Sequence, residues 1–183
     1  MFALSLVFLP LQTINFYSMK KEAYTKEWIK SAVVLPFNVT IVIPFLILYL
    51  THFEYKMPSI FQMAVGLSLL MAGLFLAVWT MVLFHKIGKG TLAPWAATKH
   101  LIVEGPYKVT RNPMITGILA VLAGETIILN TLSILYWLIL FFIINCIYFK
   151  LYEEKDLERK FGEEYTEYKK NVPMWFPRIR LKK

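Results

Sequence analysis

Two long apolar segments limit what this chain can fold into. Residues 61–84 contain no charged side chain, and residues 28–50 contain only Lys30, near the start of the segment. At about 1.5 Å per residue, an α-helix of either length crosses a hydrocarbon core about 30 Å thick. Hydrophobic residues make up 57% of the 183 residues and charged residues only 17%, which leaves too little polar surface for a soluble domain. The sequence therefore predicts an integral membrane protein.

Two shorter apolar segments follow, at residues 113–129 and 132–149. Because only Asn130 and Thr131 separate them, we expect a tight helical hairpin. The first apolar stretch, residues 1–17, is just long enough to span the bilayer but also fits an interfacial anchor, so both alternatives stay open. The expected fold is an all-α, polytopic membrane helix bundle of four to five transmembrane helices, with a C-terminal helical hairpin and a cytosolic tail.

The chain is expected to form a single membrane domain, residues 1–183. Residues 1–84 would supply the N-terminal membrane helices, and residues 85–183 the hairpin 113–149 and the tail. The net charge of +8 does not indicate a nucleic-acid partner, because the basic residues flank the apolar segments. The tail from Lys150 carries ten basic residues among seven acids. Basic residues mark the cytosolic side of a bilayer, so the loop 85–112 and the tail are expected in the cytosol.

The third apolar segment opens with Arg111-Asn112-Pro113. Asn is a favourable N-cap and Pro a favourable first helical residue, so a helix is expected to begin here, at the cytosolic membrane surface. The backbone N–H groups and the dipole of such a helix start suit an anionic group, such as a carboxylate.

If the hairpin pairs about residues 130–131, Lys150 lies level with Arg111, and Glu153 lies level with Lys108. The acidic cluster after the last apolar segment then converges with the helix start on one polar site. The alternative is a solvated helix face, with Glu154 and Glu158 paired to lysines one turn away.

Four short motifs stand in order around this hairpin: His100 to Tyr107, Arg111 to Met114, Glu153-Glu154, and Phe161 to Tyr165 followed by Tyr168 and Val172-Pro173. Together they resemble the isoprenylcysteine carboxyl methyltransferase and phospholipid methyltransferase superfamily, over about residues 88–177. The resemblance implies an integral membrane methyltransferase that uses S-adenosylmethionine. Its acceptor would be lipophilic and would reach a cytosolic active site from the bilayer.

The resemblance also implies which residues form the site. Arg111 and Glu154 are the candidates for the reacting centre, with Glu154 as a proton acceptor or an orienting group. No metal is implied, and the three histidines lack metal-ligand spacing. The residues implied for the cofactor pocket are Leu101, Ile102, Gly105, Tyr107, Asn112, Pro113, Met114, Ile115 and Glu153.

Three positions depart from the superfamily pattern. Asn112 stands where a His is usual, and Ile115 where a Tyr often closes the motif; Asn cannot act as a base near neutral pH. Phe149 stands where the carboxyl methyltransferases have an Arg that holds the substrate carboxylate. A prenylcysteine carboxylate is therefore a less expected acceptor than a lipid amine or another small lipophilic nucleophile. Two further functions stay open: an NADPH-dependent membrane reductase of the sterol reductase type, and a non-catalytic membrane protein of the same fold.

Overall fold

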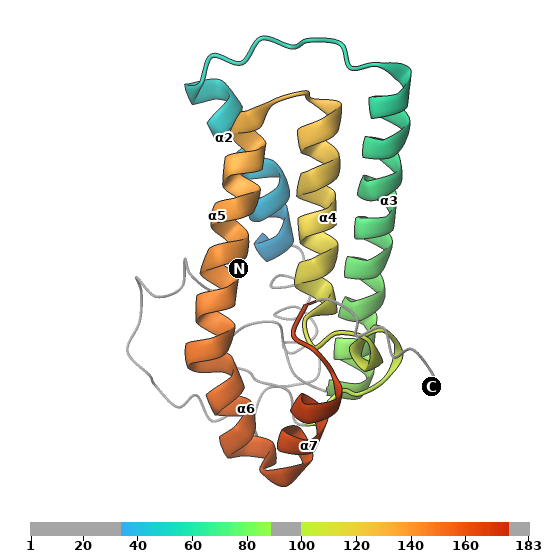
Figure 1. Ribbon diagram of the computed structural model, residues 1–183, viewed down its shortest axis with the longest axis vertical. Helices are drawn as coiled ribbons and strands as arrows, with labels where there is room; N and C mark the ends of the chain where they lie inside the picture. The colour runs from blue at the N-terminus through green and yellow to red at the C-terminus, as the bar shows by residue number, and fades with distance from the viewer. Residues whose placement is uncertain (1–33, 89–99, 176–183) are drawn as a thin grey trace, which may run out of the picture.

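The computed structural model describes residues 34–88 and 100–175, and every regular element within these ranges is helical. Figure 1 shows upright helices side by side, with short helices gathered at the lower end. The π-helical elements are η3 (Asn38–Val42), η4 (Phe84–Gly88) and η7 (Phe149–Glu153), and η6 (Gly105–Lys108) is a 3₁₀ turn. The α-helices are α2 (Ile43–Leu50), α3 (Ile60–Leu83), α4 (Pro113–Ile128), α5 (Leu132–Tyr148), α6 (Glu154–Phe161) and α7 (Glu163–Asn171).

Local sequence signals set the helix boundaries. α3 begins at a reciprocal cap, in which Ser59 N–H donates to the Gln62 side chain at 2.8 Å and Gln62 N–H donates to the Ser59 hydroxyl at 3.2 Å. The tight turn between α4 and α5 has Asn130 in the left-handed region, with φ 49°, a conformation that Asn tolerates. Thr131 then caps α5 by accepting from Ser133 N–H. The predicted hairpin of residues 113–149 is confirmed.

Four glycines let α3 and α4 pack closely as an antiparallel pair. A Cβ atom on Gly73 would lie 2.6 Å from the carbonyl oxygen of Gly117, and one on Gly124 would lie 2.6 Å from the carbonyl oxygen of Gly66. Backbone meets backbone at both points, so no side chain fits there. Small residues promote this kind of approach between helices in a bilayer. The contact fixes the start of α4 against the end of α3.

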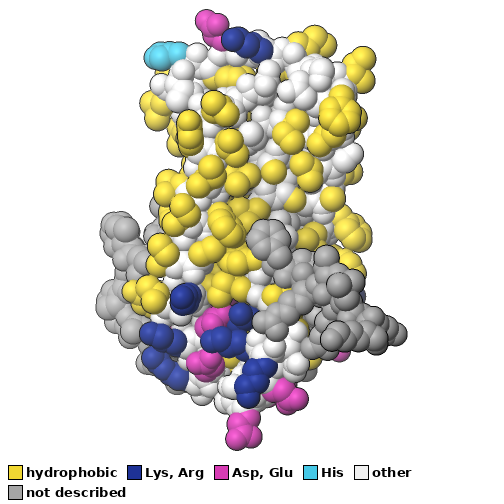
Figure 2. All heavy atoms as spheres, in the orientation of Figure 1, with side chains coloured by type: hydrophobic (Ala, Val, Ile, Leu, Met, Phe, Trp, Pro, Cys, Tyr) yellow, Lys and Arg dark blue, Asp and Glu magenta, His cyan; other side chains and the backbone are white. Residues whose placement is uncertain are grey.

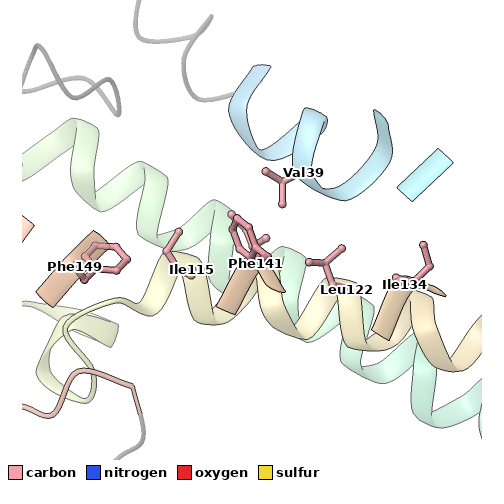
Figure 3. Packing of buried hydrophobic residues seen from close by; sticks show 7 residues of the cluster. Val39, Ile115, Leu122, Ile134, Phe141 and Phe149 are labelled. Atoms are coloured by element: carbon pink, nitrogen blue, oxygen red, sulfur yellow. The ribbon is translucent and has the colours of Figure 1, made fainter. Parts of the chain in front are cut away.

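A row of apolar side chains fills the space between η3, α4 and α5 (Figure 3). Val39 points from η3 toward side chains of α4 and α5, and Trp137 of α5 donates its indole N–H to the Val39 carbonyl at 3.1 Å. The buried members of this cluster are Val39, Ile115, Ile118, Leu122, Ile134, Phe141 and Phe149. The row ends at Phe149, directly before the polar end of the bundle.

The surface matches a protein held in lipid. Figure 2 shows hydrophobic side chains covering the upright part of the bundle, with most charged side chains at the end that carries α6 and α7 and a few at the opposite end. Large side chains on the outside are exposed, such as Phe75 at 67% and Leu140 at 51%. Ile60–Gly88 and Leu132–Phe161 are long and apolar enough to cross a membrane, and Val34–Leu50 and Pro113–Ile128 are shorter apolar helices. The expected membrane helix bundle is confirmed, while the number of crossings stays a prediction.

Several expectations concern residues outside the described ranges. They are the spanning or anchoring segment 1–17, the start of the apolar segment 28–50, part of the loop 85–112, and the tail beyond residue 175.

Candidate functional site

A buried ion pair joins the start of α4 to the start of α6. Arg111 Nη1 lies 2.5 Å from Glu154 Oε1, and the two side chains are only 11% and 9% exposed. The hairpin explains this meeting, because α5 continues through η7 into α6 and carries Glu154 past the first residues of α4. Level pairing of the hairpin had placed Lys150 beside Arg111; the observed partner lies one helical turn further, and the long arginine side chain spans that step.

Glu154 also binds a second cation. Its Oε2 lies 2.6 Å from Lys169 Nζ, and the same ammonium lies 2.8 Å from Glu158 Oε1. The hydrogen bonds that Lys169 donates to Glu154 and Glu158 raise the pKa of Lys169. Both oxygens of Glu154 are thus occupied, and the carboxylate holds α4, α6 and α7 together. Of the two roles open for Glu154, this geometry suits the orienting group.

Glu153, the residue before Glu154, lacks such cationic partners among the described residues. It is the last residue of η7 and follows the apolar segment that ends at Phe149. Its Oε2 is buried and has no hydrogen-bond partner among the described residues. Burial, together with the nearby carboxylates of Asp156 and Glu154, raises the pKa of Glu153 to about 8. Arg111 Nε is likewise buried without a partner in the described ranges. Buried polar atoms are normally satisfied, so both atoms are candidates for contact with a ligand.

Three tyrosines border these carboxylates. Tyr168 donates its hydroxyl to the Tyr107 carbonyl at 2.7 Å, which ties α7 to η6. Arg111 Nη1 donates to the Tyr165 hydroxyl at 3.4 Å, and the rings of Tyr165 and Tyr168 lie 6.1 Å apart. Burial raises the pKa of all three tyrosines, so they stay neutral at physiological pH. They enclose the polar site with aromatic surface rather than with charge.

The start of α4 has the predicted position but not the predicted cap. Asn112 is the N-cap residue and Pro113 the first helical residue, yet the Asn112 side chain does not cap the helix. Its amide instead lies 3.4 Å from the Met174 carbonyl, which also accepts from the Thr110 hydroxyl at 2.7 Å. The N–H groups of the first turn are therefore left without a side-chain acceptor, a setting that suits an anionic ligand group.

The segment after α7 closes the site on the bilayer side. Arg111 N–H donates to the Pro173 carbonyl at 2.9 Å. Trp175 packs on α5 and η7, with its ring centroid 5.3 Å from that of Phe142 and 5.7 Å from that of Phe149. Residues 172–175 thus run between the start of α4 and the end of α5.

The remaining residues of the expected pocket lie in the approach to α4. Gly105 has φ +55°, and the turn that it opens packs against Trp79 and Leu83 of α3. Ile102 is buried, whereas Leu101 is half-buried. Pro113 and Ile115 are buried, with Ile115 inside the apolar core, and Met114 packs at the edge of that core. Hydrogen bonds and ion pairs connect Arg111, Asn112, Glu154 and Tyr107 through α7 and the segment that follows it, whereas the other expected residues lie at the same end of the bundle.

The sequence analysis did not identify the contribution of α7. Lys169, which binds Glu154, was not among the candidates, although a usable signal existed. Tyr165, Tyr168, Lys169 and Val172 follow one another at the i, i+3, i+4, i+7 spacing of a helix face. Tyr165 and Val172 are buried, and this face is the one that covers the site. In the described ranges, no group of three His, Cys, Asp or Glu side chains is placed to hold a metal ion.

Comparison with known proteins gives one match. A family model described as phospholipid methyltransferase matches residues 61–164, more than half of the chain. The matched region runs from α3 to the first residues of α7 and includes both partners of the buried ion pair. It also begins further upstream than the motifs do, so α3 belongs to the matched region as well. No curated protein and no solved structure matches the chain.

Proposed function

The chain belongs to the phospholipid methyltransferase family, and from this premise we propose that it transfers the methyl group of S-adenosylmethionine to a lipid amine. The observation that carries the proposal is the buried Oε2 atom of Glu153, which has no hydrogen-bond partner among the described residues and lies at the same end of the bundle as the start of α4. The site would lie on the cytosolic side of the membrane, at the charged end of a multi-pass bundle.

The residues present fit the cofactor. The start of α4, from Asn112 to Ile115, offers N–H groups to its carboxylate. One Glu153 oxygen would accept from its ribose hydroxyls or ammonium, and the ring of Tyr107 would face its positive charge. Leu101, Ile102 and Gly105 would line the pocket from the approach to α4. When bound there, the cofactor supplies a methyl group that its sulfonium already activates.

Positioning and exclusion of water would then supply most of the catalysis. Arg111 and Glu154 fix the start of α4 relative to α6, and Lys169 fixes α7 over both. Trp175 and the apolar row ending at Phe149 form the side of the site that faces the bilayer. A lipophilic acceptor would bring its chain along this apolar surface and its headgroup to the polar site.

The charges near the site support an amine rather than a carboxylate acceptor. Phe149 is 4% exposed and packs on Trp175, so the position of the expected substrate-binding Arg is closed and apolar. Arg111 and Lys169 are both paired with Glu154. Lys150 is exposed. A buried carboxylate without a cationic partner is very costly, which disfavours a prenylcysteine substrate.

Calorimetric titration of the detergent-purified chain separates the proposal from its two rivals. We expect binding of S-adenosylhomocysteine and none of NADPH. Binding of NADPH alone would favour a membrane reductase, and binding of neither would favour a non-catalytic protein.

The acceptor is tested by radiolabelled methyl transfer in one set of membranes that contain both phosphatidylethanolamine and a farnesylcysteine analogue. We expect label in the lipid amine. Efficient labelling of the farnesylcysteine analogue with none in the lipid would overturn the assignment of the acceptor.

A further inference from the structure

One carboxyl group at the site, that of Glu153, takes part in none of the ion pairs among the described residues. Glu154 and Glu158 share the cations of Arg111 and Lys169. Glu153 has no ion-pair partner among residues 34–88 and 100–175, and its Oε2 is buried without a hydrogen bond. The two consecutive glutamates are therefore not equivalent. Glu154 is held by cations, whereas Glu153 has an oxygen available to a ligand.

Methyl transfer to a lipid amine creates a need for such an oxygen. A primary alkyl amine is an ammonium near neutral pH, and an ammonium has no lone pair with which to attack a methyl group. Resting on the proposed function, we propose that Glu153 accepts the proton that the acceptor ammonium loses before the methyl group is transferred.

The step balances in protons and electrons. The ammonium gives one proton to Glu153 Oε2, which leaves a neutral amine and a carboxylic acid. The amine lone pair forms the new N–C bond while the S–C bond breaks, and the sulfonium becomes a neutral thioether. The product is a methylated ammonium, and Glu153 returns its proton to water. The transfer uses one oxygen of the carboxylate, and a contact with the cofactor would use the other.

The raised pKa of Glu153 agrees with its proposed role as proton acceptor. A carboxylic acid of pKa about 4.5 lies about six units below a primary ammonium, whereas Glu153, at about 8, lies about two units below. Proton transfer is most effective when donor and acceptor are matched near the working pH. Among the described residues, the titratable groups that interact electrostatically with Glu153 are Tyr107, Tyr148, Glu154, Asp156 and Tyr165.

Glu154 is less suited to the same task. Arg111 and Lys169 lie 2.5 Å and 2.6 Å from its two oxygens, and a proton arriving there would have to displace one of these cations. Opposite charges at such distances favour the ionised carboxylate. Glu154 thus positions its neighbours, and Glu153 is the group placed to exchange a proton.

The experiment compares the full-length wild type with Glu153→Gln and with the control Glu163→Gln, an exposed acid on the first turn of α7. Each protein is returned to phosphatidylethanolamine vesicles, and methyl transfer is followed as a function of pH. Glu153→Gln should lower kcat by about 10²- to 10⁴-fold near neutral pH. Its residual rate should climb about tenfold per pH unit, because the ammonium then loses its proton to water. The control should behave as the wild type.

Two further measurements distinguish proton transfer from a structural role. Calorimetry should show that Glu153→Gln binds S-adenosylhomocysteine within about fivefold of the wild type, because the amide keeps a hydrogen bond. A lipid with an aromatic amine, which is neutral at pH 7, should be methylated by Glu153→Gln at close to the wild-type rate.

The inference is overturned if Glu153→Gln keeps the wild-type rate and pH profile, or if it is equally impaired toward the neutral amine. A wild type that methylates no amine overturns both the inference and the proposed function. The two failures are distinguishable, because activity of the wild type tests the proposed function, whereas the comparison with Glu153→Gln tests the inference.

Discussion

Arg111 and Glu154 lie 43 positions apart in the sequence, yet their charged groups form an ion pair of 2.5 Å inside the protein. The pair connects the start of α4 to α6, the continuation of α5 beyond its apolar segment. Because Glu154 also binds Lys169, the loss of this one carboxylate would release three elements at once. The first prediction follows from that arrangement.

Glu154→Ala should destabilise the protein by about 3–5 kcal/mol, because it leaves Arg111 buried without its partner. The measurement is unfolding in mixed detergent micelles. The matched control is Asp156→Ala, which removes the exposed ion pair with Arg159 and should cost at most about 1 kcal/mol. Equal decreases in the free energy of unfolding for the two variants would show that the buried pair stabilises the protein no more than the exposed one.

Glu153→Ala should weaken binding of S-adenosylhomocysteine by about ten- to a hundredfold, the cost of a lost charged hydrogen bond. The fold should persist, since Glu153 lies beyond the apolar segment and takes no part in the ion pairs of Glu154. Calorimetry gives the affinity, and circular dichroism gives the helix content. Unchanged affinity would remove Glu153 from the cofactor pocket.

The stability of the ligand-free protein should fall as the pH rises from about 5 to about 8. Folded Glu153 keeps its proton up to about pH 8, whereas unfolded Glu153 loses it near pH 4.5, so the unfolded chain binds fewer protons in this window. Glu153→Gln cannot titrate and should flatten this dependence, with a melting temperature several degrees above the wild type at pH 8.5. Thermal unfolding in detergent checks it, and parallel curves for the two proteins would contradict it.

Gly73→Ala should separate α3 from α4 and cost about 1–3 kcal/mol, because the new Cβ meets backbone atoms that cannot move aside. Ser68→Ala, on the exposed face of the same helix, is the control and should be nearly neutral. Unfolding in mixed micelles compares them. A neutral Gly73→Ala would mean that the two helices are not in the close contact seen here.

The C-terminus should lie in the cytosol, because ten basic residues follow the last apolar segment. A reporter fused after the tail should be active only inside the cell, whereas one inserted in the turn at residues 51–59 should be active only outside. A C-terminal reporter active outside the cytoplasm would reverse the orientation.

Hydropathy and turn chemistry were enough to predict the helices but not how they face one another. The pair Asn130-Thr131 located the hairpin, and the hairpin predicted that Arg111 would approach the acids after Phe149. Hydropathy gives the length of a membrane helix and not its rotation, so the contact between Gly73 and Gly117 did not follow from the apolar pattern. The exact partner of Arg111 also depended on side-chain reach rather than on helix register.

The contribution of the last part of the chain was the hardest to predict. Residues 172–175 have no helical periodicity, and their contacts with Thr110 and Asn112 come through backbone carbonyls that any residue provides. Sequence carries little information about such contacts. Lys169 lies in a polar segment whose charged residues are typical of a solvent-exposed helix. Its spacing from Tyr165 nevertheless placed it on the buried face.

The hydrogen bond from Arg111 to Pro173 has a consequence for the order in which the protein matures. Because the chain is synthesised from its N-terminus, α3, α4 and α5 are made before α7 and the segment after it. Until these residues emerge, the start of α4 has neither its covering segment nor Lys169. The membrane helices α3, α4 and α5 are thus made before the residues that cover the start of α4.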